Sequence, residues 1–270
     1  MEIIAKISKG SNMDQIYIPK IRYGLNVGEY VIIKPLKEEK PIERLYFRNI
    51  NNIEPMKLEI IKEIIKIIDK NIENENIIIT GSFLDKGFNF NDIDIIVITA
   101  EIGKKEKNID NIKEKIIEKI NIGSHILILN NKILLDGLSK DPLYLLMLSR
   151  CISKKRFIYK IKKRVNYKLL DLHLLKSKIL INNFDFLNGD EKYYSLRNMI
   201  AISFFLENKK INKNSIEKEI KRIFSLDINK IKQNLINKQD FIKKYKLIYN
   251  GVYKKILSGI KNDTKQKQIN

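Results

Sequence analysis

The chain has 270 residues, of which 44% are hydrophobic and 31% charged. This composition is too apolar for general disorder, and the length suits roughly one to three domains with cores of their own. Lysine and arginine outnumber aspartate and glutamate by 52 to 32, so the net charge is +20. Such an excess favours nucleic acid as the leading partner. The alternative is that the lysines only solvate exposed helix faces.

Cys151 is the only cysteine, so the chain can form neither an internal disulfide nor a cysteine zinc site. No apolar run approaches the ~18 residues of a membrane span, and the first residues lack the basic and apolar segments of a secretory signal. We therefore expect a cytoplasmic protein without a membrane partner.

The first 36 residues predict a small β unit. Three short apolar runs, EIIAKIS, QIYIP and EYVIIKP, are separated by turns, one of them at Asn26 to Gly28. The segment LKEEKPIE, residues 36–43, is charged and contains a proline, which is typical of a linker. We expect a first domain over residues 1–40.

The next hundred residues predict a sheet covered by helices, forming a second domain over residues 41–141. Apolar side chains recur with helical period over residues 56–70, and a second helix is expected over 105–120. Short apolar runs indicate buried strands at residues 77–80, 94–99 and 125–129.

After Asp141 the sequence changes to long helical segments, because Asp141 can cap a helix and Pro142 suits its first position. The expected helices cover residues 142–153, 166–182, 190–207, 213–224 and 227–258. We expect a helical domain over residues 142–262 and a frayed tail over 263–270. The predicted fold class is α+β, with a small N-terminal β unit, a central mixed sheet with helices and a C-terminal all-α domain.

The stretch GSFLDKGFNFNDIDIIVI, which begins at Gly81, joins two of the expected strands. Side chains two residues apart in a strand share a face, so Asp92 and Asp94 project together while their isoleucine neighbours pack on the opposite face. Paired carboxylates repel each other unless a cation lies between them, and Mg²⁺ prefers carboxylates together with substrate phosphates. The spacing predicts a magnesium site for phosphoryl or nucleotidyl transfer.

The glycine and serine before this pair suit a phosphate. Gly81 lets the backbone turn tightly, and Ser82 offers a hydroxyl and a main-chain N–H to a phosphate oxygen. A helical turn starting at Phe83 would add the positive end of its dipole. The alternative is an ordinary loop between two buried strands, with a solvated Asp-x-Asp at its end.

A strand, Gly-Ser, nine residues and then Asp-x-Asp resembles the signature of the DNA polymerase β-like nucleotidyltransferase superfamily, over about residues 56–141. The resemblance implies a nucleotidyltransferase-type mixed sheet, in which Gly81 and Ser82 hold the triphosphate of a nucleoside triphosphate donor. It also implies that Asp92 and Asp94 bind Mg²⁺ as catalytic residues. The implied reaction moves a nucleoside monophosphate to a hydroxyl acceptor, with RNA favoured and protein as the alternative, and releases pyrophosphate.

The superfamily normally supplies a third carboxylate from a later strand. Here the strand expected from His125 contains no acid. Asp136 is the best replacement as a third catalytic residue, and for Asp141 the alternative is a helix cap. His125 can be a base, a metal ligand or a packed strand-end side chain. Without a third acid, nucleotide binding would remain while transfer is weakened or lost.

A segment without acids follows between residues 150 and 168. Its basic residues are Arg150, Lys154, Lys155, Arg156, Lys160, Lys162, Lys163, Arg164 and Lys168. Such side chains neutralise phosphates, and the interleaved Phe157, Tyr159 and Tyr167 can stack on bases, so we expect RNA or single-stranded DNA here. Lys154 and Arg156 are also candidates for neutralising the donor triphosphate. The alternative is a connector with a buried apolar side and a solvated basic face.

The segment IYIPKIRYGLNVGEYVIIKPL, residues 16–36, resembles the swapped-hairpin DNA-binding family of AbrB-like regulators through its IPK turn, Arg22, Gly24-Leu25 and Gly28-Glu29-Tyr30-Val31. That family pairs two such segments into an interlocked dimer, so the resemblance implies a homodimer through residues 1–36. An ordinary hairpin appendage is the alternative. Beside the Mg²⁺-dependent nucleotidyltransferase, a second function is therefore open: a non-catalytic nucleic-acid-binding regulator with a degenerate transferase core.

Overall fold

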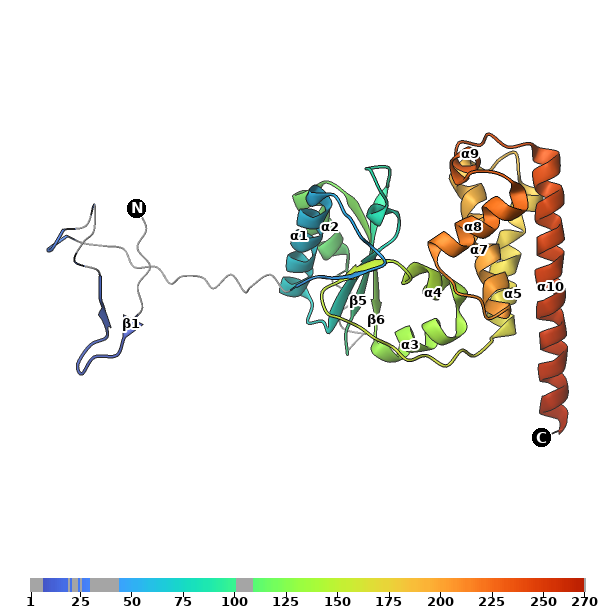
Figure 1. Cartoon of the computed structure of the whole chain (residues 1–270). Coiled ribbons are helices and arrows are strands. Elements are labelled where there is room, and N and C mark those ends of the chain that lie inside the picture. The colour runs from blue at the N-terminus through green and yellow to red at the C-terminus, as the bar shows by residue number, and fades with distance from the viewer. Residues whose placement is uncertain are drawn as a thin grey trace. The chain divides into compact units, whose positions relative to one another are not determined.

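The structure is a computed structural model that describes residues 7–18, 20, 24, 26–29, 44–100 and 109–269, with side chains described up to residue 262. The chain divides into two compact units, Met1–Glu43 and Arg44–Asn270 (Figure 1). The division falls at the end of the charged segment 36–43.

The first unit contains a two-stranded antiparallel sheet, in which β1 (Ile7–Ser8) pairs with β2 (Gln15–Ile16). The backbone and side-chain amides of Asn26 both donate to the Glu29 carboxylate, at 2.9 and 2.8 Å, which closes the expected turn. Residues 30–35 of the strand expected over 29–35, and Arg22 of the AbrB-like segment, lie outside the described residues. The interlocked dimer therefore stays a prediction.

A five-stranded mixed sheet organises the second unit. Its strands are β3 (Tyr46–Arg48), β4 (Asn76–Thr80), β5 (Asp92–Ile98), β6 (Gly123–Leu129) and β7 (Cys151–Ser153). They lie in the order β3-β7-β4-β5-β6, and only β5 and β6 run parallel to each other. The α+β fold class is confirmed, and β4, β5 and β6 lie within two residues of the expected strands.

The residues expected to form one helix over 142–153 instead form a short helix, α4 (Pro142–Met147), followed by strand β7. β7 lies between β3 and β4, so the sheet uses residues beyond the boundary expected at residue 141. The prediction was wrong because a strand of three residues is too short for its period to show against a helical background.

Helices cover both faces of this sheet, and the strand residues alternate between them. α1 (Pro55–Asn71) and α2 (Ile109–Ile120) pack on the face formed by Ile77 and Ile95. α3 (Asn131–Lys140), a helix that the sequence did not predict, packs with the residues around α4 on the face of Ile78 and Ile96. Buried isoleucine on both faces explains why β4 and β5 are continuous apolar runs.

The C-terminal half is helical and has a core of its own. Its helices are α5 (Tyr167–Ser177), α6 (Ile179–Asn182), α7 (Gly189–Leu206), α8 (Lys213–Phe224), α9 (Ile228–Lys232) and α10 (Lys238–Ile269). α7 supplies ten buried residues and begins at a capping box between Asn188 and Glu191. α5, α8, α9 and α10 surround it, and α10 forms the outer edge in Figure 1.

Two helices replace the single helix expected over residues 227–258. α9 ends at Lys232 and α10 begins at Lys238. Asn234 lies between them with a positive φ of 61°, a conformation that asparagine tolerates better than most residues and that interrupts a helix. α10 continues to Ile269, so the helix extends into the residues expected to fray.

Candidate active site

Asp92 and Asp94 lie at the start of β5, at the edge of the sheet where β4 ends. Asp94 pairs with Thr80 on β4 and with His125 on β6. Both carboxylates continue the strand face of Ile96, which packs with α3 and the residues around α4. The predicted side-by-side projection of the two carboxylates is therefore a consequence of the strand that carries them.

Gly81 makes the close approach to this carboxylate pair possible. Its φ is 83° and its ψ is −165°, a region that residues with a Cβ rarely adopt. A Cβ placed on Gly81 would lie 2.0 Å from Oδ2 of Asp94. A single 3₁₀ turn, η1 (Ser82–Leu84), follows, so the helical turn expected from Phe83 is present.

The loop after η1 is held by a fully buried lysine on α1. Lys57 Nζ donates to the carbonyl oxygens of Asp85 and Gly87 at 2.5 Å each and pairs with Glu54 at 3.2 Å. Three phenylalanine rings surround the ammonium at 5.3 to 5.7 Å from their centroids: Phe83, Phe88 and Phe90. This cation–π cage and the two carbonyl acceptors compensate for the desolvation of Lys57 and fix the loop that leads into the site.

The carboxylate pair is electrostatically strained. Burial raises the pKa of the Asp94 carboxyl, and the charge of Asp92 raises this pKa further. His125 and Arg197 act in the opposite direction, and His125 Nδ1 lies 3.7 Å from Oδ1 of Asp94. A cation between the carboxylates would relieve the repulsion that the protein leaves in place.

The carboxylates face a cavity of about 520 Å³ between the sheet and the helical region. Gly81, Ser82, Asp92 and Asp94 line it on the sheet side. On the other side its lining residues come from α7, α8 and α9: Tyr193, Tyr194, Arg197, Asn198, Lys213 and Lys232. One cavity therefore combines paired carboxylates, a glycine-serine turn, cations and aromatic rings.

Arg197 is the most informative of these cations. Within the part of the chain that the structure describes, its guanidinium donates to the side-chain oxygen of Asn198 alone, at 3.1 and 3.2 Å, and lies 4.7 Å from the ring centroid of Tyr194. Among the residues that the structure describes, no carboxylate pairs with it within 4.0 Å. Burial lowers the pKa of Arg197, but arginine keeps its charge at physiological pH. A partly buried guanidinium without a carboxylate partner is suited to an anionic ligand.

A third carboxylate that lines the cavity, that of Asp85, is already neutralised. Asp85 forms ion pairs with Arg150 and, at 2.6 Å, with Lys213 on α8. Arg150 also donates to the carbonyl oxygen of Leu84. This cluster ties the loop after η1 to the helical region. Among the described residues, no lysine or arginine lies within 4.0 Å of the carboxylates of Asp92 and Asp94.

The carboxylate pair fits a magnesium ion. The carboxylates offer oxygen ligands, and a hard cation between them would offset their mutual repulsion. Gly81, which has no Cβ, leaves the space beside the Asp94 carboxylate open. Among the described residues, no group of three or more His, Cys, Asp or Glu side chains is arranged to hold a metal. Mg²⁺ would thus take two protein carboxylates and complete its ligand shell from phosphate and water, and when bound it stabilises charge on phosphoryl oxygens.

The structure does not bring Asp136 to this cavity. Asp136 lies on α3, where it pairs with Lys140 at 2.7 Å and with Arg164 at 3.0 Å. These two cations lower the pKa of Asp136. The position beside Asp94 is occupied by His125, as the parallel register of β5 and β6 shows. The expectation of Asp136 as a third catalytic acid therefore has no geometric support.

Lys154 and Arg156 also lie away from the cavity, because β7 runs from the cavity towards the opposite end of the sheet. β7 is antiparallel to β4, which ends at the cavity. The amides of Lys154 and Lys155 donate to Ile77 and to the Asn76 side chain, at the opposite end of β4. Lys154 Nζ pairs with Asp69 of α1 at 2.7 Å. Only Arg150, which precedes β7, reaches the cavity.

Most of the cations that line the cavity were not predicted from the sequence. Arg197, Lys213 and Lys232 lie about a hundred residues or more after the glycine-serine motif, singly, on three helices of a lysine-rich chain. No local pattern marks them. These three side chains line the same cavity only after the helical region has folded against the sheet.

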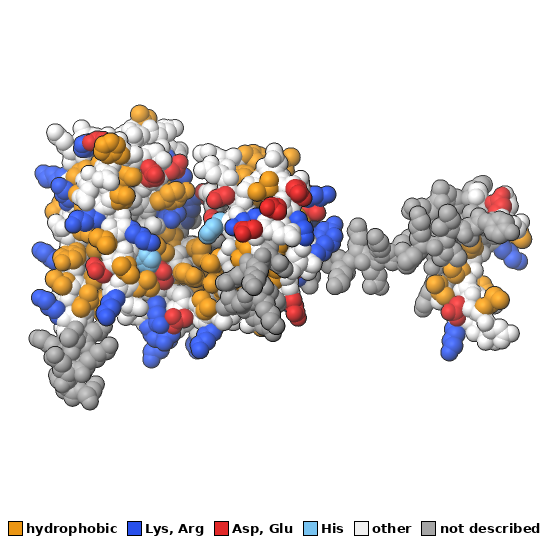
Figure 2. Space-filling view, turned by 180° about the vertical axis from the view of Figure 1, so that it is seen from behind, with side chains coloured by type: hydrophobic (Ala, Val, Ile, Leu, Met, Phe, Trp, Pro, Cys, Tyr) orange, Lys and Arg blue, Asp and Glu red, His pale blue; other side chains and the backbone are white. Residues whose placement is uncertain are grey.

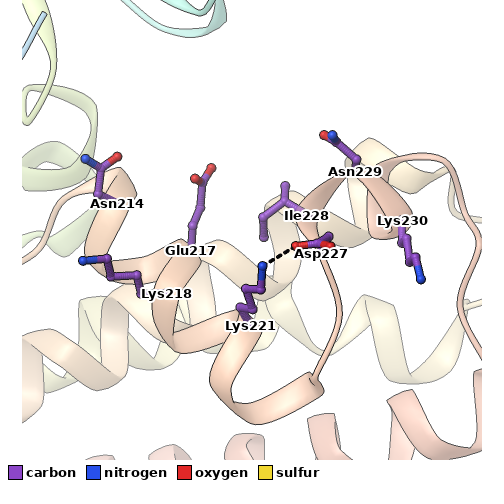
Figure 3. A pocket seen from close by; sticks show the side chains of 8 residues that line it. All are labelled: Asn214, Glu217, Lys218, Lys221, Asp227, Ile228, Asn229 and Lys230. Atoms are coloured by element: carbon purple, nitrogen blue, oxygen red, sulfur yellow. Dashed lines mark hydrogen bonds and ion pairs between the residues drawn. The ribbon is translucent and has the colours of Figure 1, made fainter.

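A second hollow, of about 560 Å³, lies over α8 and α9 (Figure 3). Asn214 and Glu217 stand on one side and Asn229 on the other, and Lys221 pairs with Asp227 at 2.6 Å. The Glu217 carboxylate accepts a hydrogen bond from Tyr193 at 3.0 Å. Because its acids are satisfied and no carboxylate pair faces it, this hollow is not the candidate site.

None of the helices that the structure describes is both long and apolar enough to cross a membrane. No family model matches the chain, and neither the curated proteins nor the solved structures contain a significant match to it.

Proposed function

We propose that the protein is a Mg²⁺-dependent nucleotidyltransferase that moves a nucleoside monophosphate from a nucleoside triphosphate to a hydroxyl acceptor. One observation carries the proposal: Asp92 and Asp94 face Arg197 across a cavity that also contains Lys213 and Lys232. Two carboxylates together with Arg197, which pairs with no carboxylate within 4.0 Å among the described residues, suit a magnesium–triphosphate ligand, whose metal and phosphates carry the complementary charges.

The residues of the cavity divide the work on such a donor. Ser82 and the η1 turn offer a hydroxyl and an N–H to phosphate oxygens, and Arg197 and Lys213 neutralise charge on the triphosphate. Tyr194, which is partly exposed and lies beside Arg197, offers a ring for the base. Asp92 and Asp94 would hold the metal ion.

The proposed reaction is a substitution at the α-phosphorus. The acceptor oxygen forms the new O–P bond while the bond between the α-phosphorus and the oxygen bridging to the β-phosphate breaks. Pyrophosphate leaves with that electron pair, and the hydroxyl proton passes to solvent. The protein contributes mainly positioning and electrostatic stabilisation, which dominate phosphoryl-transfer catalysis.

Transfer of label from α-³²P nucleoside triphosphates to RNA or protein, in the presence of Mg²⁺, tests the proposal. Asp92→Asn and Asp94→Asn should each lower the rate by about 100-fold or more, because each removes a metal ligand without changing side-chain size. Asp136→Asn is the matched control and should keep the rate within about threefold of wild type. Equal labelling by all four proteins would reject the proposal.

A second candidate is a nucleotide-binding regulator without transfer activity. The observation that favours it is the carboxylate count: His125 lies beside Asp94, and Asp85 is paired with Arg150 and Lys213. Calorimetry separates the two candidates. A sensor would bind a magnesium–triphosphate through the cavity and yet transfer no label, whereas the transferase would do both.

A further inference from the structure

The connector between β7 and α5, residues 154–166, contains most of the basic side chains that the sequence assigned to nucleic acid. It adopts no regular strand, yet its side chains alternate between partly buried and exposed along its length. Phe157, Tyr159 and Ile161 pack against the core on the α3 face of the sheet. The side chains between them therefore point to solvent.

The exposed side of the connector forms a basic ridge, which consists of Arg156, Lys160, Lys162, Arg164 and, at the start of α5, Lys168. Arg164 pairs with Asp136. Among the described residues, no acid pairs within 4.0 Å with the other four. In an extended chain, alternate residues lie about 6.6 Å apart, so Lys160, Lys162 and Arg164 follow a line. The exposed Ile158 separates Arg156 from this line, and Lys168 continues it on α5.

α3 widens the ridge because it runs beside the connector. The Tyr159 hydroxyl donates to Asn131 at 3.1 Å, and the Arg164 amide donates to the Ser139 carbonyl oxygen at 2.8 Å. α3 adds Lys132 to this surface, and its single acid, Asp136, is paired with Lys140 and Arg164. Figure 2 shows Lys and Arg side chains along the lower edge of the molecule, the edge at which Figure 1 draws the connector.

We infer that the basic ridge binds the phosphate backbone of a single-stranded nucleic acid. A line of cations can follow one extended strand, whereas a duplex would meet such a line only where its backbone crosses it. The aromatic residues of the segment do not take part, because Phe157 packs inward and lies 5.6 Å from Arg48, and Tyr159 is bonded to α3. Binding is therefore electrostatic, dependent on salt and nearly independent of base identity.

This inference does not depend on the proposed transfer activity. The ridge starts at the end of the sheet opposite the cavity, and binding requires neither a nucleoside triphosphate nor Asp94. The Asp94→Asn protein should bind nucleic acid like the wild type. If the protein transfers label but its ridge does not bind nucleic acid, the ridge inference is rejected and the proposed transferase function stands. If the ridge binds nucleic acid but no label is transferred, the proposed function is rejected and the ridge inference stands.

Fluorescence anisotropy of the full chain with a labelled oligouridylate of about 20 nucleotides, without nucleoside triphosphate, tests the ridge. Lys160→Glu/Lys162→Glu should weaken binding by about tenfold or more at low salt and flatten the dependence on salt, because fewer phosphates are neutralised. Lys218→Glu/Lys230→Glu, on the exposed surface of α8 and α9, is the matched control with the same change of charge. Thermal unfolding of both variants verifies that they are folded.

Three outcomes would overturn the inference. The first is an equal loss of affinity in the ridge variant and the control, which would mean that total charge alone drives binding. The second is a preference above about tenfold for one homopolymer, which would require base contacts. The third is binding to phosphatidylserine vesicles that depends on the ridge while the oligonucleotide does not bind, which would assign the ridge to an anionic lipid surface. A DNA oligonucleotide of the same length should bind similarly, because the ridge contacts phosphates.

Discussion

The two walls of the cavity are built in different ways. Asp92 and Asp94 stand on one strand of a buried sheet, within about fifteen residues of the turn at Gly81, whereas the cations Arg197, Lys213 and Lys232 come from three separate helices. The carboxylate wall is thus a local feature supported by close-packed isoleucine. The cation wall is a product of how α7, α8 and α9 pack, and single substitutions should affect the two walls differently.

The largest effect is expected at the support of the carboxylate wall. Lys57→Met leaves the carbonyl groups of Asp85 and Gly87 without their donor and Glu54 without its ion pair, so we expect a loss of about 3 kcal/mol or more in the free energy of unfolding. Urea unfolding measures it. The control is Lys62→Met on the same helix, which breaks a surface pair and should cost less than about 1 kcal/mol. Equal losses would mean that the ring cage contributes nothing.

Gly81→Ala should be the next most damaging change. The backbone conformation of Gly81 is strained for alanine, and the new Cβ would collide with the Asp94 carboxylate. We expect a loss of about 2 kcal/mol of stability and weaker binding of magnesium–triphosphate. Gly123→Ala on β6, where a Cβ meets no atom within 4 Å, is the control for a calorimetric titration. An unaffected Gly81→Ala protein would show that the carboxylate does not need its present position.

On the cation wall, Arg197→Met should weaken binding of a non-hydrolysable nucleoside triphosphate by about tenfold, because a charge-assisted hydrogen bond contributes roughly 1.5 to 3 kcal/mol. Arg156→Met is the matched control, since Arg156 lies at the far end of the sheet and should not change the affinity. If Arg156→Met weakens binding and Arg197→Met does not, the triphosphate lies at the end of the sheet opposite the cavity.

The smallest expected effect is a gain. Asp94→Asn removes a charge that burial and Asp92 disfavour, so the variant should melt a few degrees above the wild type at neutral pH without metal. Because the pKa of Asp94 is raised in the folded state, the charged carboxylate destabilises the wild type by its full amount at pH values above that pKa. The difference in stability between wild type and Asp94→Asn disappears at pH values below the ordinary aspartate pKa of 3.8. Asp136→Asn should show the opposite sign, because cations lower the pKa of Asp136. Melting curves from pH 3 to 8 decide the matter, and a destabilised Asp94→Asn protein would contradict the strain argument.

Much of the carboxylate wall could be predicted because its information is local. The alternation of Ile93, Asp94 and Ile95 sets both the strand and the direction of each side chain, and burial of the isoleucines confirms it. Short strands were the weak point. β3 and β7 have three residues each, and missing β7 placed Lys154 and Arg156 at the wrong end of the sheet.

The sequence by itself determined the α+β class, the strand that pairs Asp92 with Asp94, and the turn at Gly81, because strand periodicity and the absence of a Cβ act within a few residues. Only the tertiary structure decided that His125 stands beside Asp94, that Asp136 is held on α3 by Lys140 and Arg164, and that Arg197 faces the carboxylates. These are contacts between elements distant in the chain. Their geometry follows from the packing of two cores against each other, for which no short stretch of sequence holds the information.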